Sequence, residues 1–205
     1  MVVIVDDDAA VRNAVGSLLR SVGYEIAFAA SAIDLVECDM LTRASCLVLD
    51  VRLPILSGLD FQRKLAELGA VVPIVFMTGH ADVPMTVRAM KAGAVDFLSK
   101  PFRDQEMLDA VAGAVERDRL AREARDSISD IKARYSTLTS RETEIFGLAT
   151  AGLLNKQIAA RLDLSEITVK IHRGKMMKKM DARTFATLVR MAEAMGINSS
   201  AGRPK

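Results

Sequence analysis

The chain has no tryptophan, only two cysteines and few aromatic residues of any kind, which together make up 4% of its 205 positions. Cys38 and Cys46 are too few and too poorly spaced for a disulfide framework or a zinc site, so we expect two reduced thiols. No apolar stretch approaches the roughly 18 residues of a transmembrane helix. Residues 1–5 are apolar but run directly into three acids, which is wrong for a signal peptide. We therefore expect a cytoplasmic protein with no membrane partner.

Charge is nearly balanced over the whole chain but unevenly divided along it. The net charge is +2. Residues 136–205 hold 12 basic and 6 acidic residues, a net charge of +6, which leaves the first 135 residues at −4. An acidic front part and a basic back part favour a regulatory or metal-binding module joined to a nucleic-acid binder, although solvated faces can give the same pattern.

The front part alternates short β-branched or apolar runs with segments of helical spacing, five times in succession. Continuous apolar strands of this kind predict a doubly wound, five-stranded parallel sheet covered on both faces, of the flavodoxin type. The expected strands are 2–5, 24–29, 46–49, 73–77 and 95–98, and the expected helices are 9–19, 31–40, 58–68, 84–92 and 103–117. We expect this domain to span 1–118.

The rest of the chain is expected to be helical. Residues 119–135 are charged and contain neither glycine nor proline, and they keep a helical spacing of apolar residues, which predicts a helical linker. An all-α domain is expected over 136–198 and a flexible tail over 199–205.

Polar side chains stand at the carboxyl ends of four of the expected strands, where parallel sheets bind their ligands. They are Asp6, Asp7, Asp50, Thr78 and Lys100. A carboxylate such as Asp50 can attack phosphorus. Asp6 or Asp7, together with Asp50, can supply the oxygen ligands of a hard divalent cation. Lys100 and the Thr78 hydroxyl can then hold the transferred phosphoryl oxygens.

These residues resemble the receiver domain of two-component response regulators through the strings VIVDDD, LVLD, MTGH and SKPF, which start at residues 3, 47, 77 and 99. The resemblance implies that a sensor histidine kinase phosphorylates Asp50. It implies that Asp7, Asp50 and the backbone carbonyl of Arg52 hold Mg²⁺, with Asp6 acting mostly through water. It further implies that Thr78 and Lys100 contact the phosphoryl group, and that Phe97 is the aromatic switch residue.

Alternatives remain for several of these positions. The acidic run 6–8 is also what the N-terminus of a helix favours, and Phe97 could be an ordinary core aromatic. By the same resemblance, Arg52 and His80 would set the rate of dephosphorylation, although solvated loop residues are the default for both.

The basic end of the chain carries the pattern of a helix-turn-helix. A short helix over 155–162 is followed by a tight turn, and Ser165 then caps a helix that runs to about residue 180. Val169, Met176 and Met180 are spaced to face the core, and the methionines there are core filler. Lys170, Ile171, Gly174 and Lys178 occupy another face, available to a major groove. Phosphate contacts are expected from Lys156, Arg173, Lys175 and Lys179.

The strings LTSRE, NKQIA and LSEITVKIHR, starting at residues 138, 155 and 164, resemble the LuxR-type effector domain of FixJ-like and NarL-like regulators. The resemblance implies that the second helix faces DNA and that the helix after Asp181 supports dimerisation. Relatives carry a basic residue where this chain has Gly174. His172 could equally be a packed boundary residue, and a bundle with a merely solvated basic face is the structural alternative. The expected DNA contacts are Lys156, Ser165, Thr168, Lys170, Ile171, His172, Arg173, Lys175 and Lys178.

The combined prediction is a phosphorylation-dependent DNA-binding transcription regulator and not an enzyme. Phosphorylation of Asp50 would draw in Thr78, repack Phe97 and pair the surface of 84–91 with a second copy, so that a homodimer binds promoter DNA, with RNA polymerase as a possible further partner. One alternative is a phosphatase of the haloacid-dehalogenase kind, but such enzymes want an acid where this chain has Arg52. Another is a constitutive DNA binder whose front domain only binds other proteins.

Overall fold

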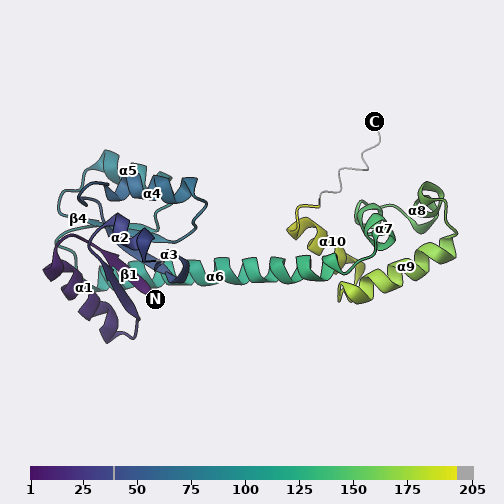
Figure 1. Cartoon of the computed structure of the whole chain (residues 1–205), viewed down its shortest axis with the longest axis horizontal. Coiled ribbons are helices and arrows are strands. Elements are labelled where there is room, and N and C mark those ends of the chain that lie inside the picture. Colours follow the sequence, from purple (N-terminus) through teal and green to yellow (C-terminus); the bar gives the residue numbers. More distant parts are fainter. Residues whose placement is uncertain (39, 198–205) are drawn as a thin grey trace. The chain divides into compact units, whose positions relative to one another are not determined.

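The computed structural model describes residues 1–38 and 40–197, which form two compact units that divide after Arg122. In the front unit, the described residues form one parallel sheet of five strands in the order β2-β1-β3-β4-β5 (Figure 1). The strands are β1 (Val2–Val5), β2 (Ile26–Ala29), β3 (Cys46–Asp50), β4 (Ile74–Thr78) and β5 (Asp96–Ser99). The predicted doubly wound α/β fold is confirmed, and each strand lies within two residues of its predicted bounds.

Helices cover both faces of this sheet. They are α1 (Ala9–Ser21), α2 (Ala32–Glu37), α3 (Met40–Arg43), α4 (Gly58–Glu67), α5 (Val83–Lys91) and α6 (Asp104–Ser136). The single helix predicted over 31–40 was wrong: α2 ends at its C-cap, Cys38, and α3 is a separate short helix. Ser31 caps α2 as expected, its hydroxyl accepting the backbone N–H of Asp34 at 3.2 Å.

Alternate strand residues serve the two faces, as the period of two requires. Val3, Val5, Leu47, Leu49 and Phe76 pack with α2–α5 on one side. Ile4, Cys46, Val48, Val75 and Met77 pack with α1 and α6 on the other. All ten of these side chains are completely buried. A sheet with both faces covered has only its edges and strand ends free, so the polar residues at the strand ends define the accessible site.

Helix α6 continues beyond residue 117, and residues 119–135, which were predicted as a helical linker, are part of it. Near its middle, Asp118 is 2% exposed and accepts a hydrogen bond of 2.6 Å from Arg122 Nε. The Arg122 guanidinium also donates to the Ala44 carbonyl at 2.8 Å, which fastens this turn of α6 beside the start of β3. The finer domain boundaries predicted from composition stay predictions, and the predicted tail 199–205 lies outside the described residues.

The described residues of the second unit form four further helices, α7 (Ser140–Thr150), α8 (Asn155–Leu162), α9 (Glu166–Lys179) and α10 (Phe185–Ala194). Val169, Met176 and Met180 are fully buried, as their spacing predicted. Across the described residues of both units, every helix is too short or too polar to cross a bilayer.

Candidate functional site

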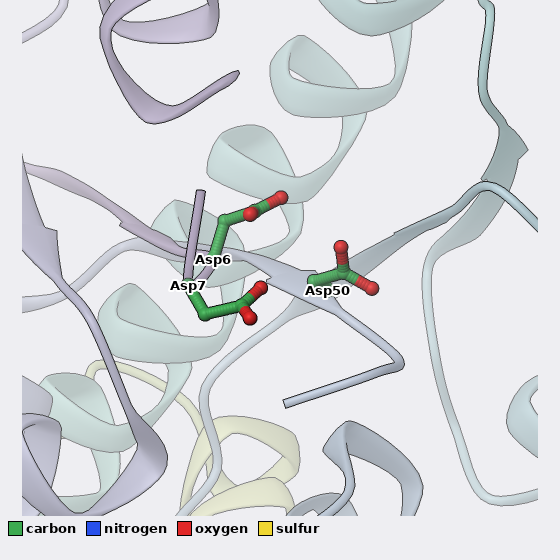
Figure 2. A group of neighbouring side chains, drawn as sticks. All are labelled: Asp6, Asp7 and Asp50. Carbon is green, nitrogen blue, oxygen red and sulfur yellow. The ribbon is translucent and has the colours of Figure 1, made fainter. Parts of the chain in front are cut away.

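Three carboxylates converge at the carboxyl ends of neighbouring strands. Asp6 and Asp7 follow β1 and Asp50 ends β3, and one oxygen from each lies within 4.8 Å of the other two (Figure 2). Asp6 is 1% exposed and Asp50 is 7% exposed, whereas Asp7 faces solvent. The sequence predicted this grouping, because the ends of β1 and β3 are adjacent in the sheet.

Lys100 lies between two of these acids. Its ammonium donates to Asp6 Oδ2 and to Asp50 Oδ2, at 2.6 Å in both cases. Burial raises the pKa of Asp6, and the hydrogen bond from Lys100 only partly opposes this. Burial works to lower the pKa of Lys100, but the hydrogen bonds to Asp50 and Asp6 outweigh it, and the net pKa is raised. The site therefore holds a charged lysine against its carboxylates.

Backbone donors fix the remaining oxygens of the two buried acids. Asp50 Oδ1 accepts the N–H of Arg52 at 2.8 Å, and Asp6 Oδ1 accepts the N–H of Asp8 at 2.8 Å. Asp8 itself is the N-cap of α1, so the helix-terminus alternative for the acidic run holds for Asp8 and not for Asp6. The side chain of Arg12 donates to the Asp6 carbonyl, a contact that no sequence motif indicated.

Gly58 is a second residue that the sequence reasoning missed. It begins α4, and its N–H donates to the Val51 carbonyl at 2.9 Å. A Cβ at Gly58 would lie 2.4 Å from the backbone oxygen of Asp50, closer than real Cβ atoms approach. Glycine is therefore required for α4 to start directly against the backbone of Asp50. Its position eight residues after the aspartate was the only sequence signal.

Thr78 and Phe97 lie on the neighbouring strands. Thr78 ends β4 and is completely buried, and its hydroxyl accepts the N–H of His80 at 3.3 Å. The Thr78 carbonyl accepts the backbone N–H of Lys100 at 2.7 Å, which joins the ends of β4 and β5. Phe97 is half-buried and packs against the core, its ring centroid 6.1 Å from that of Phe76. In this structure the predicted switch aromatic is thus a core contact.

The donor set at this edge fits a hard cation. Three carboxylates offer oxygen ligands of the type that Mg²⁺ prefers, and an acidic cluster of this kind is typical of divalent-cation binding. The side chain of Arg52 is exposed, and a groove of about 550 Å³ lined partly by Asp7, Arg52 and Arg88 opens beside the cluster.

In the second unit, α8 and α9 are joined by a three-residue turn. Asp163 takes a left-handed conformation with φ of 53°. Ser165 then caps α9, its hydroxyl accepting the N–H of Thr168 at 3.1 Å. The predicted DNA contacts divide by exposure. Thr168, His172 and Arg173 are half-buried, and the exposed ones are Lys156, Ser165, Lys170, Ile171, Lys175 and Lys178.

Two basic residues of α9 are bound within the fold. The Arg173 guanidinium donates to Asn155 Oδ1 at 2.5 Å and lies 5.0 Å from the centre of the Phe185 ring, so it connects α9 to α8 and α10. Lys179 donates to the Glu142 carboxylate at 2.6 Å and to the Thr137 carbonyl at 2.9 Å. Lys179 was expected to contact phosphate, and its ammonium is instead committed to these oxygens.

Comparison with known proteins agrees with both units. Residues 2–112 match the response regulator receiver domain, and residues 136–192 match the bacterial regulatory proteins of the luxR family. The chain is 55% identical to Nodulation protein W of Bradyrhizobium diazoefficiens over 98% of this chain and 88% of that protein. It is 42% identical to Transcriptional regulatory protein FixJ of Rhizobium meliloti over 96% of this chain and 97% of that protein. Among solved structures, the response regulator StyR has a TM-score of 0.79 and 43% identity, over 94% of this chain and 97% of that one.

A receiver domain implies a kinase as phosphodonor, and the luxR-family domain implies DNA as a partner. The phosphatase alternative is thereby excluded, since this family regulates transcription and is not enzymatic. With its receiver followed by a LuxR-type DNA-binding domain, the chain belongs to the FixJ-like two-component response regulators, which control transcription in a phosphorylation-dependent way.

Proposed function

We propose that Asp50 is the phosphoacceptor and that its donor is the phosphohistidine of a sensor histidine kinase. A carboxylate oxygen of Asp50 forms the new bond to phosphorus as the P–N bond breaks, and the electron pair of that bond stays on the imidazole nitrogen. The observation that carries the proposal is the position of Lys100, whose ammonium lies 2.6 Å from Asp50. A fixed positive charge at that distance can receive a phosphoryl oxygen without reorganising.

Asp6, Asp7 and Asp50, with the backbone carbonyl of Arg52, are the proposed ligands of Mg²⁺. The bound cation would offset the negative charge of the entering phosphoryl group. Support comes from the convergence of the three carboxylates. Lys100 orients Asp50, and the buried Thr78 hydroxyl is the proposed donor to the transferred group.

The output of phosphorylation is proposed to be a homodimer formed through α5 and β5. Val83, Val87 and Met90 are spaced for one face of α5 and are 76%, 44% and 42% exposed. An apolar stripe of this kind on the outside of a helix favours burial against another protein surface. The proposed link between Asp50 and that surface consists of Thr78, at the end of β4, and Phe97, on β5.

The dimer would place two copies of α9 on adjacent half-sites of promoter DNA in the cytoplasm, where RNA polymerase is the further partner of a promoter-bound regulator. Lys156, Ser165, Lys170, Ile171, Lys175 and Lys178 are the proposed DNA contacts, because all six are exposed. Thr168, His172 and Arg173 are half-buried and stay in the proposed set, with Arg173 positioning α9 through Asn155.

The proposal is tested with the full chain, Mg²⁺ and acetyl phosphate, an acyl-phosphate donor that requires no kinase. Phosphate-affinity electrophoresis measures the phosphorylated fraction, and gel filtration measures the change in assembly. Asp50→Asn should abolish both, and Asp109→Asn, which changes an exposed acid of α6, should leave both unchanged. Phosphorylation of Asp50→Asn to the level of the parent chain would contradict the assignment. Tight DNA binding that ignores the phosphodonor would favour a constitutive binder instead.

A further inference from the structure

The outermost line of residues along α9 differs in character from its flanks. Since an α-helix has 3.6 residues per turn, positions i, i+4, i+7 and i+11 fall on one line. Val169 and Met176 mark the buried face. The opposite line consists of Ile167, Ile171, Gly174 and Lys178. Two apolar side chains and a glycine therefore occupy the part of α9 that lies farthest from the core.

The two isoleucines have no evident role in folding. Ile167 is 73% exposed and Ile171 is 54% exposed, and within the described residues neither belongs to the apolar clusters of the second unit. A β-branched side chain on an exposed helix surface is also a weaker helix former than alanine, leucine or lysine. The fold gains little from isoleucine at either place.

Gly174 gives an independent indication that something approaches this line. A Cβ built on Gly174 meets no atom within 4 Å in the described structure, so packing within the chain does not require glycine. Glycine inside a helix is destabilising relative to alanine. What its missing side chain does provide is room for an external group to come close to the backbone of α9.

The flanks of the line identify the kind of partner. Lys170 and Lys175 are exposed on α9 beside the line, Lys178 ends the line, and Lys156 is exposed on α8. A rim of ammonium groups around an apolar line fits a polyanion that also presents apolar groups. Double-stranded DNA meets both conditions, because its phosphates are anionic and the C5-methyl group of thymine projects into the major groove.

We propose that Ile167 and Ile171 read thymine methyl groups in the major groove, and that Gly174 lets α9 approach the base edges closely enough for this contact. The inference rests on the proposed role of α9 as the DNA-facing helix and adds a base preference to it. Isoleucine has no hydrogen-bonding group, so at these positions the choice of base depends on the methyl group.

The test begins with DNA sites selected from a random duplex library by the full chain treated with Mg²⁺ and acetyl phosphate. Each thymine of a selected site is then replaced by deoxyuridine, which removes only the methyl group, and dissociation constants are measured. At the contacted thymines the substitution should weaken binding about fourfold per methyl, the value of one buried carbon group. The Ile167→Ala variant should show a similar loss of affinity for the selected sites. Replacing the thymine that Ile167 contacts by deoxyuridine should then weaken its binding no further.

Two variants separate base reading from stability. Gly174→Ala should raise the urea midpoint of unfolding and yet weaken binding to the selected sites, which a purely structural glycine would not do. Ile33→Ala, which trims an exposed isoleucine of α2, should bind as the parent chain does.

The inference is overturned if deoxyuridine leaves every affinity unchanged, or if Ile167→Ala keeps the full response. It is also overturned if Ile167→Ala alters only the assembly state in gel filtration, because the line would then be a contact between copies. Selection of DNA that depends on phosphorylation but ignores the methyl groups defeats this inference alone. Failure to select any DNA defeats the proposed function as well.

Discussion

Replacement of Glu142 tests how the second unit is held together. The residue is 2% exposed, and its carboxylate accepts from Lys179 Nζ at 2.6 Å and from the N–H of Thr139 at 2.9 Å. Lys179 also donates to the Thr137 carbonyl at 2.9 Å. Glu142 thereby connects the segment after α6, the start of α7 and the end of α9.

The expected loss follows from these contacts. Thr139 and Glu142 form a reciprocal capping box, and loss of such a cap costs about 1 kcal/mol. A hydrogen bond to a charged group contributes about 1.5–3 kcal/mol. Since the Lys179 side chain is 34% exposed, it can turn toward water, and the full penalty of an unpaired buried charge does not apply. We expect Glu142→Ala to lower the free energy of unfolding by about 2–3 kcal/mol, and Glu142→Gln by about 1–2 kcal/mol, because glutamine keeps the acceptor for Thr139.

The effect should depend on pH in a defined direction. The hydrogen bond from Lys179, followed by the one from Thr139, lowers the pKa of Glu142 from its usual 4.5. A carboxyl group with a depressed pKa stabilises the fold above its unfolded-state pKa and loses that contribution as pH falls through the folded-state pKa. The difference in the free energy of unfolding between the parent chain and Glu142→Gln should therefore be largest at neutral pH and should decrease below pH 4.5.

Urea unfolding followed by far-ultraviolet circular dichroism measures this difference. Glu144→Gln is the matched control: Glu144 is half-exposed, its partner Arg141 lies 2.7 Å away on the surface, and the change should cost less than about 0.5 kcal/mol. A difference in the free energy of unfolding between the parent chain and Glu142→Gln that stays constant with pH would refute the proposed pairing of Glu142 with Lys179. So would a double-mutant cycle with Lys179→Met that gives no coupling.

Three further predictions concern the receiver. Gly58→Ala should lower stability by about 1–3 kcal/mol and slow phosphorylation by acetyl phosphate, since its Cβ would meet the Asp50 backbone. The control Gly113→Ala, in open space on α6, should raise stability by about 0.5–1 kcal/mol. Equal urea midpoints for the two variants would contradict the proposed clash at Gly58. Ile55 is 89% exposed with φ of 70°, so Ile55→Gly should stabilise by about 1 kcal/mol while Ile55→Ala, which keeps a Cβ, should not. Burial raises the pKa of the Cys46 thiol to about 12. A chromogenic disulfide reagent should therefore label exposed Cys38 in the native chain and Cys46 only in urea. Equal labelling rates of the two thiols in the native chain would contradict this prediction.

The fold was predictable because buried parallel strands leave a strong sequence signal. An uninterrupted apolar run such as 46–49 has few alternatives between two turns, and β3 occupies Cys46–Asp50. Helix ends were less predictable. The segment 31–40 has one cap and one helical spacing, so the break between α2 and α3 left no local sign. For α6, nothing in the sequence stopped the helix at 117, and it continues to Ser136.

The site was predictable to the level of residues but not of contacts. In a parallel sheet the carboxyl ends of all strands lie at one edge, so Asp6, Asp7 and Asp50 could be grouped from sequence alone. The bonds from Lys100 to Asp6 and Asp50 depend on side-chain paths that only the fold specifies. Charge alone likewise could not distinguish Lys179, which is paired with Glu142, from Lys178, which is exposed.

The double role of Lys100 also constrains how such a chain can change over evolutionary time. Lys100 forms an ion pair with two buried acids, so its loss takes this partner from both Asp6 and Asp50, whereas loss of either acid leaves the lysine one partner. In a lineage released from selection for signalling, the acids can therefore disappear one at a time before the lysine does. A degenerate relative is then expected to keep its lysine after the phosphoacceptor has gone, and the reverse order should be rare.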